Sequence, residues 1–188
     1  MSHLCDGAMS WCNVSGDRCV TSTHLDRMWR LVDQHGRRDV TVSRAWLLLV
    51  YPLLVDVVGR LVDMAAADQG VPGRSSGSRL VVYSGHDKTL TALLSALHLY
   101  DGRWPVLAAR VVIELTTGAL RLTDSGRGPP RYYFRLLYDG RDMTSRLDFC
   151  LESSTPGGCP LDNLTYRVFY RVIKEFGFAT HAEACTAR

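Results

Sequence analysis

Apolar residues recur at helical spacing near the start of the chain. The segment from about His24 to Gln34 carries them on a single face, which predicts an amphipathic helix. Ser22 or Thr23 would cap this helix, and Gly36 would end it. The preceding residues, 1–23, are rich in Cys, Ser, Gly and Asn and indicate a loop held by disulfides.

A second helix is predicted over Val42 to Asp63. Its apolar face is wide, so most of this helix should be buried, and Pro52 would kink it. The most apolar stretch, Trp46 to Val55, is far shorter than the roughly 20 residues that a membrane helix needs. Gln69 to Ser78 has the composition of a flexible loop.

The rest of the chain alternates between strand and helix patterns. Leu80 to Tyr83 is a short run of strand formers, and Lys88 to Tyr100 has helical spacing. The remaining predicted elements are strands at Ala109–Leu115, Ala119–Thr123 (paired across Gly118) and Tyr132–Tyr138, and a helix at Leu161–Phe176. This order predicts an α/β fold in which helices cover a sheet, with a helical portion before it.

Composition and charge exclude several classes of protein. Apolar residues make up 46% of the 188 residues and charged residues 22%, which is typical of one globular domain. The formal net charge of +3 is too small for the dense basic stripe of a nucleic-acid-binding protein.

Six cysteines cluster at the two ends of the chain. None forms a Cys-x-x-Cys pair, so disulfides are favoured over a zinc site. Two glycosylation sequons, at Asn13 and Asn163, agree with an oxidising, lumenal or extracellular compartment. Cys150 and Cys159 are close enough to pair over a short loop, although six cysteines allow 15 pairings.

The first residues contradict this compartment. Met1 to Ser10 contains no basic segment followed by an apolar run, so no signal peptide or anchor is visible there. The expectation is that an N-terminal part of the protein is missing from this sequence.

Candidate chemistry lies at His86 and Asp87, between the predicted strand at Leu80–Tyr83 and the following helix. The start of a helix offers unpaired N–H groups and a positive dipole end to an anion. A histidine there can donate hydrogen bonds to phosphate oxygens, and a protonated aspartate can act as general acid. The alternative is purely structural, because aspartate at such a junction is often only a helix cap.

The residues around this pair resemble the histidine acid phosphatase family. Tyr83-Ser84-Gly85-His86-Asp87, with the leucines that follow, is similar to the family's C-terminal signature. The resemblance runs from about Leu80 to Cys185 and includes Trp104-Pro105, the Tyr138-Asp139-Gly140 turn and Cys159-Pro160-Leu161. It implies that 1–79 belong to a helical cap domain with a Cys-rich loop, and 80–188 to the C-terminal part of the family's sheet domain.

The resemblance also implies a mechanism without a metal or an organic cofactor. A histidine in an Arg-His-Gly-x-Arg-x-Pro motif attacks phosphorus, the residue matching His86 holds phosphate oxygens, and the one matching Asp87 protonates the leaving alcohol. The implied substrate is a phosphate monoester, in particular a phosphorylated xylose of the proteoglycan linker in the Golgi. The alternatives are a broad-specificity acid phosphatase and an inactive, truncated lumenal protein. Membrane attachment would need an anchor that this sequence does not show.

One stretch imitates the missing motif. His35 and Gly36 are followed by two arginines, but Gln34 stands where an arginine is required and Val40 replaces the proline. The preceding residues have helical spacing, whereas the family motif follows a buried strand. His35 is therefore predicted to lie at a helix end, and the nucleophile is expected to be absent from the chain. Without the strands that its sheet needs, the isolated chain is expected to expose apolar surface and to be poorly soluble or inactive.

Overall fold

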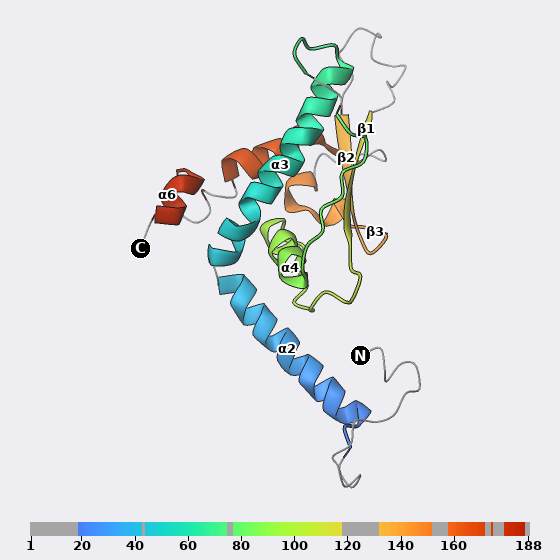
Figure 1. Cartoon of the computed structure of the whole chain (residues 1–188), viewed down its shortest axis with the longest axis vertical. Helices are drawn as coiled ribbons and strands as arrows, with labels where there is room; N and C mark the ends of the chain where they lie inside the picture. The colour runs from blue at the N-terminus through green and yellow to red at the C-terminus, as the bar shows by residue number, and fades with distance from the viewer. Residues whose placement is uncertain are drawn as a thin grey trace.

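The protein combines helices with a small antiparallel sheet, as predicted at the level of an α/β fold (Figure 1). The computed structural model describes residues 19–42, 44–74, 77–117, 132–151, 158–171, 174 and 179–186, with 35–42, 44–46 and 171 described by their backbone alone. The predicted strand at Ala119–Thr123 and the sequon at Asn13 lie outside these residues.

The first helix, α2 (Ser22–Val42), is longer than predicted. Thr21 precedes it and caps it, since its hydroxyl oxygen accepts a hydrogen bond from the His24 backbone N–H at 3.4 Å. The helix does not end at Gly36, because a glycine inside a helix costs only about 1 kcal/mol relative to alanine. The imitation motif therefore lies inside a helix, and not at the predicted helix end.

The second helix, α3 (Arg44–Asp68), runs along the whole body of the molecule, and Pro52 lies inside it (Figure 1). It extends five residues beyond the predicted end at Asp63. The described part of the predicted loop after it is irregular, and Arg74 in that loop forms an ion pair with Asp63.

The predicted strand at Leu80–Tyr83 is not a strand. In the part of the chain that the structure describes, no other strand pairs with it, and residues 80–86 run as irregular, exposed backbone. Leu80 and Val82 are 79% and 80% exposed. Strand-forming side chains alone do not make a strand, because the backbone N–H and C=O groups need a neighbouring strand to bond with. The predicted helix after this segment is present as α4 (Asp87–Ala96).

The sheet is built around one central strand. Strand β2 (Tyr132–Tyr138) has the predicted bounds and pairs along its length with β1 (Val111–Thr117). Two short strands, β3 (Arg141–Asp142) and β4 (Cys159–Pro160), pair with β2 near its two ends. All of these pairings are antiparallel.

Strand β1 starts two residues later than the predicted Ala109. A turn precedes it, in which the Ala109 N–H donates to the Val106 carbonyl at 3.1 Å and Ala108 has a φ of 60°. The Arg110 N–H donates at 2.9 Å to the Asp139 carboxylate, so the backbone joins the ladder only after these bonds.

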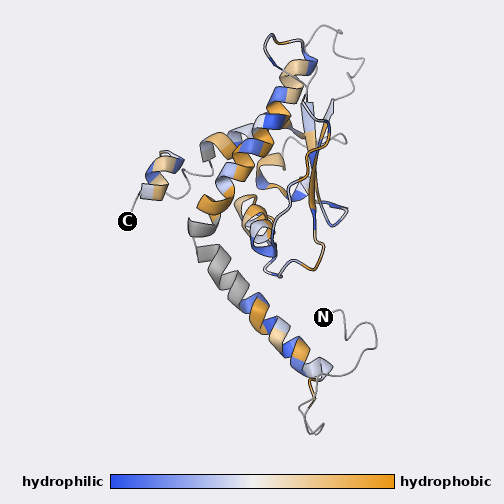
Figure 2. Cartoon of the chain, viewed as in Figure 1, coloured by the Kyte–Doolittle hydropathy of each residue, from blue (hydrophilic) through white to orange (hydrophobic). Residues whose placement is uncertain are grey.

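One face of the sheet packs on the helices, and this contact forms the core (Figure 2). On β2, Phe134 and Leu136 are fully buried, and their partners in the register are Leu115 and Ile113 of β1. These residues share a face because side chains alternate along a strand. They join one buried cluster with residues from α3, α4, α5 and the loops. Its fully buried helical members include Leu54, Val58, Leu164 and Val168.

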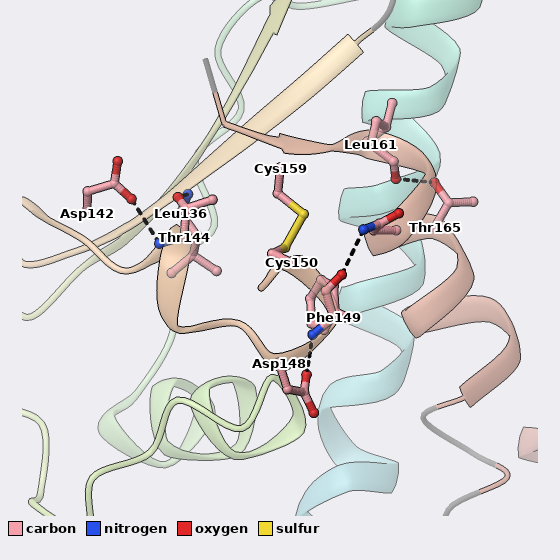
Figure 3. The surroundings of a disulfide bond; sticks show 10 residues. Leu136, Asp142, Thr144, Asp148, Phe149, Cys150, Cys159, Leu161 and Thr165 are labelled. Atoms are coloured by element: carbon pink, nitrogen blue, oxygen red, sulfur yellow. Dashed lines mark hydrogen bonds between the residues drawn. A yellow bond between two sulfur atoms is a disulfide. The ribbon is translucent and has the colours of Figure 1, made fainter. Parts of the chain in front are cut away.

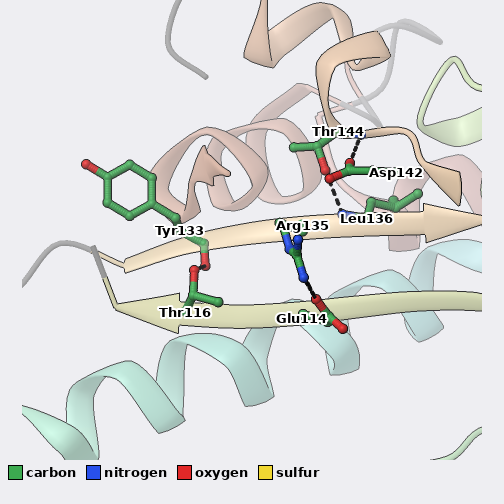
Figure 4. A network of polar contacts seen from close by, with 7 residues as sticks. All are labelled: Glu114, Thr116, Tyr133, Arg135, Leu136, Asp142 and Thr144. Atoms are coloured by element: carbon green, nitrogen blue, oxygen red, sulfur yellow. Dashed lines mark hydrogen bonds and ion pairs between the residues drawn. The ribbon is translucent and has the colours of Figure 1, made fainter. Parts of the chain in front are cut away.

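The opposite face of the sheet carries polar pairs (Figure 4). Glu114 and Arg135 face each other across β1 and β2 and form an ion pair of 2.6 Å. Beside them, the Asp142 carboxylate accepts from the Thr144 N–H at 2.8 Å, and the Thr144 hydroxyl accepts from the Leu136 N–H at 2.9 Å. These bonds fasten the turn after β3 to the central strand.

Replacing Asp142 by Asn should flatten the dependence of stability on pH. The hydrogen bonds from Thr144 lower the pKa of the Asp142 carboxyl below its ordinary value. The resulting stabilisation is present above the ordinary pKa and is lost as the pH falls through the lowered one. Lowering the pH from neutral to acidic should therefore destabilise the parent chain more than Asp142→Asn, which keeps an acceptor oxygen. Chemical unfolding at each pH measures the free energy of unfolding of the two proteins. Parallel curves for the two proteins would contradict this role.

A disulfide joins the loop after β3 to β4 (Figure 3). Cys150 and Cys159, the pair that the sequence places near each other, are bonded with their Cα atoms 5.5 Å apart, and both are fully buried. The loop contains two short 3₁₀ turns, η1 (Thr144–Arg146) and η2 (Asp148–Cys150). Cys19 is also disulfide-bonded.

The predicted helix at Leu161–Phe176 is interrupted. Helix α5 (Leu161–Tyr166) changes at Arg167 into a π-helical turn, η3 (Arg167–Arg171). Arg167 is buried and its guanidinium donates to the Ala96 carbonyl at 3.2 Å and to His98 Nε2 at 2.8 Å. These tertiary contacts have no counterpart in the local pattern of residues. A short helix that was not predicted, α6 (His181–Thr186), follows, and His181 stacks on Tyr51 of α3.

Gly158→Ala should destabilise the chain by about 1–3 kcal/mol from backbone strain alone, because Gly158 has a φ of 127°. An added Cβ would also lie 2.5 Å from the Phe134 carbonyl oxygen, so β4 would be pushed away from β2. Chemical unfolding measures the loss. Gly59→Ala is the matched control, since nothing lies within 4 Å of a Cβ at that position. Equal stabilities for Gly158→Ala and the parent chain would contradict this packing.

Candidate active site at the start of helix α4

His86 and Asp87 lie together at the exposed N-terminus of α4. His86 is the residue that precedes the helix, with an extended backbone, and its carbonyl accepts the first helical hydrogen bond from Leu90 at 3.1 Å. The Thr89 hydroxyl in turn accepts a 3.4 Å hydrogen bond from the His86 N–H. Asp87 occupies the first turn, where the helix dipole favours a negative charge.

Each carboxylate oxygen of Asp87 accepts one hydrogen bond. The Lys88 backbone N–H donates to Oδ1 at 2.7 Å, and the indole N–H of Trp104 donates to Oδ2 at 2.8 Å. The first contact is local, whereas the second comes from the loop after α4. The carboxylate is therefore held from two sides while it stays exposed to solvent.

Trp104 also contacts α2. Its backbone N–H donates to the Asp33 carboxylate at 3.0 Å. The sequence resemblance includes Trp104-Pro105 but gives Trp104 no role at the site. The signal that it missed is that a partly buried indole N–H usually has a hydrogen-bond partner, although the sequence cannot say which one.

Tyr83 fastens the exposed segment before His86 to α3. Its hydroxyl donates a hydrogen bond to the Asp56 carboxylate, which also forms an ion pair of 2.9 Å with Arg60. The hydrogen bond from Arg60, with a smaller effect of Tyr83, lowers the pKa of Asp56. Partial desolvation, followed by the bond to Asp56, raises the pKa of the Tyr83 phenol. His86 and Asp87 thus follow a tethered segment, and not the end of a buried strand as predicted.

The other sequence candidates lie elsewhere. Asn163 is in α5, and its side-chain N–H donates to the Phe149 carbonyl at 2.7 Å. His35 lies inside α2 by its backbone.

Two kinds of feature are absent from the described residues. They contain no group of three His, Cys, Asp or Glu residues placed to hold a metal ion. No helix within the described ranges has the length and apolar character needed to span a bilayer.

The known proteins that are similar to this chain share one name. The chain is 30% identical to the 2-phosphoxylose phosphatase 1 of Homo sapiens over 170 residues, which is 87% of this chain. The protein of the same name from Mus musculus is 31% identical over 87% of the chain. The one from Xenopus tropicalis is 27% identical over the whole chain. The chain is related to the 2-phosphoxylose phosphatases. The resemblance predicted from the sequence is thereby confirmed.

The match covers only part of each relative. The chain spans about a third of the curated 2-phosphoxylose phosphatases, between 32% of the human protein and 36% of the Xenopus one. No family model matches the chain. No solved structure matches it either.

Proposed function

We propose that this chain is the acid-supplying part of a larger histidine acid phosphatase. The observation that carries the proposal is the similarity, along most of the chain, to proteins named 2-phosphoxylose phosphatase 1. In this proposal, residues 1–79 belong to the helical cap and 80–188 to the C-terminal part of the sheet domain. The Arg-His-Gly-x-Arg-x-Pro motif is supplied by a region outside the chain.

The proposed substrate is the 2-phosphate of xylose in the glycan linker of proteoglycans. The nucleophilic histidine attacks phosphorus, and the bond between phosphorus and the xylose oxygen breaks as Asp87 gives that oxygen its proton. The Asp87 carboxylate then accepts a proton from the water that attacks the phosphohistidine, which releases phosphate. His86 holds phosphate oxygens during both steps. The exposure of both side chains at a helix N-terminus supports these roles.

The exposed apolar segment 80–83 supports the proposal of a larger protein. Leu80, Val81 and Val82 are 79%, 39% and 80% exposed, directly before the two candidate site residues. Consecutive apolar residues exposed to water are unfavourable in a complete domain. They also leave backbone N–H and C=O groups available to pair with another strand. We propose that the region outside the chain covers this segment, and that the isolated chain is poorly soluble or inactive without it.

We also propose that the protein works in the secretory pathway, in the Golgi lumen. The bond between Cys150 and Cys159 supports this, because disulfides persist in oxidising compartments. Imaging of a tagged protein in cells should show it with Golgi markers. A diffuse cytosolic signal would refute this location.

The experiment is a phosphate-release assay on the longest product of the gene that encodes this chain, here called the complete gene product. The substrates are a 2-phosphoxylose linker glycan and a set of other phosphate monoesters. The 188-residue chain is assayed in parallel on the same substrates. The proposal expects the complete gene product to release phosphate from the linker glycan, and the 188-residue chain to release none. Equal kcat/KM on all monoesters would indicate a broad-specificity acid phosphatase. No release from any substrate would indicate an inactive lumenal protein.

A further inference from the structure

We propose that Trp104 is a positioning residue for Asp87, which it holds and stabilises as the carboxylate that forms when the acid gives up its proton. This inference rests on the proposed function, since it concerns the same acid. The contact that carries it is the hydrogen bond of 2.8 Å from the indole N–H of Trp104 to Asp87 Oδ2.

Two donors on different oxygens fix the orientation of the Asp87 carboxyl group. The Lys88 N–H alone would hold the group at Oδ1 only. The Trp104 indole holds Oδ2 as well, and turning the group away from its present plane breaks both bonds. The lone pairs that remain on the two oxygens are then directed to solvent, where a leaving oxygen would have to lie.

Trp104 is itself held in place. Its backbone N–H donates to Asp33 of α2 at 3.0 Å, and the buried Pro105 that follows restricts its backbone to extended conformations. The Arg103 N–H donates to Asp101 at 2.9 Å, which stabilises the turn before it. The indole therefore presents its N–H from a rigid loop rather than from a mobile side chain.

The chemical effect follows from the change of charge. The indole N–H can only donate, so its bond to Asp87 strengthens when the neutral acid becomes a carboxylate. This change occurs as the proton moves from Asp87 to the leaving oxygen. The bond is thus stronger in the transition state than in the ground state, which is the condition for an effect on rate.

The kinetic signature is a dependence on the leaving group. In the complete gene product, Trp104→Phe keeps an aromatic ring, smaller than the indole, and removes the N–H. We expect kcat on an alkyl phosphate to fall by about 10-fold or more, because hydrogen bonds to charged groups are the strong ones. The loss should be several-fold smaller on p-nitrophenyl phosphate, whose leaving group needs little help from an acid, and KM should change little.

Two further variants separate positioning from structural support. In Asp87→Asn, adding Trp104→Phe should cause no further loss on the alkyl phosphate, since the two residues act as one unit. Trp29→Phe is the matched control, because its buried indole N–H has no hydrogen-bond partner among the residues that the structure describes. It should leave the leaving-group dependence unchanged.

The closing experiment adds a measurement that does not need activity. The complete gene product is labelled with 5-fluorotryptophan, and the ¹⁹F signal of Trp104 is identified by its loss in Trp104→Phe. At one fixed pH, this signal should lie at a different chemical shift in Asp87→Ala, which removes the acceptor, than in the parent protein. A signal indifferent to Asp87 would overturn the contact whether or not the protein is active.

The two arms fail separately. A Trp104 signal that follows Asp87, combined with equal losses on both substrates, would show Trp104 to be structural and would overturn the positioning role. A wild-type protein with no phosphate release would refute the proposed function and the positioning role together, while the ¹⁹F signal would still report the contact.

Discussion

In the complete gene product, Asp87→Asn should lower kcat for release of phosphate from an alkyl phosphate by about 10²–10⁴-fold, the usual contribution of general acid–base catalysis. Asparagine keeps the shape of the side chain, and its single amide oxygen can accept one of the two hydrogen bonds, from Trp104 or from Lys88, that Asp87 accepts on separate oxygens. It has no proton to give to the leaving oxygen and cannot activate water afterwards. Initial-rate kinetics on an alkyl phosphate at several pH values measure the effect.

Asp162→Asn is the matched control for this variant. Asp162 is also an exposed aspartate in the first turn of a helix, α5, so its replacement tests the loss of a helix-end charge without the proposed chemistry. Its kcat should stay close to that of the parent protein. Asp87→Asn with undiminished kcat, or an equal fall in both variants, would mean that Asp87 only stabilises the first turn of its helix.

Removing the buried disulfide should cost about 2–3 kcal/mol of unfolding free energy. The two cysteines are nine residues apart, and closing a loop of that length restricts the unfolded chain by about this amount. The bond also fastens η2 to β4, which contributes only two residues to the sheet. Chemical unfolding of Cys150→Ala/Cys159→Ala, and of the parent chain with and without a reductant, measures the loss.

Cys185→Ala is the control for the disulfide variant. Cys185 is an exposed free cysteine, so its replacement should leave the unfolding free energy within about 0.5 kcal/mol of the parent value. The reductant should destabilise Cys185→Ala as much as the parent chain. If the double alanine variant is as stable as the parent, the disulfide does not hold this part of the fold.

The local pattern predicts well those elements in which buried apolar residues recur at a regular spacing along the chain. Strand β2 has the predicted bounds because alternate residues such as Phe134 and Leu136 face the core. Helix α3 is confirmed because its apolar residues recur over many turns, and Pro52 does not stop it. The predicted end of α2 at Gly36 was wrong, because one glycine does not cost enough free energy to end this helix.

The elements that pattern alone could not predict depend on partners distant in sequence. Leu80 to Tyr83 has strand-forming side chains, but a strand exists only where another strand lies beside it, and the described residues provide none. The π-helical turn at Arg167 coincides with contacts to Ala96 and His98, about 70 residues earlier. Periodicity contains no information about such contacts.

The candidate site divides in the same way. His86 and Asp87 are adjacent in sequence, so their motif and its place before a helix could be identified directly. Trp104 is separated from Asp87 by 17 residues and from Asp33 by 71, and only the folded chain brings the three together. Its contribution to the site therefore had to come from the structure.

The central claim is that this chain belongs to a larger phosphatase whose nucleophile lies outside it. Sequencing the 5′ end of the transcript tests this claim most directly. The account predicts an open reading frame that continues upstream of Met1 and encodes an Arg-His-Gly-x-Arg-x-Pro motif. A transcript with an in-frame stop codon just upstream of Met1 would contradict it, and His86 and Asp87 would then be the remnant of a lost active site.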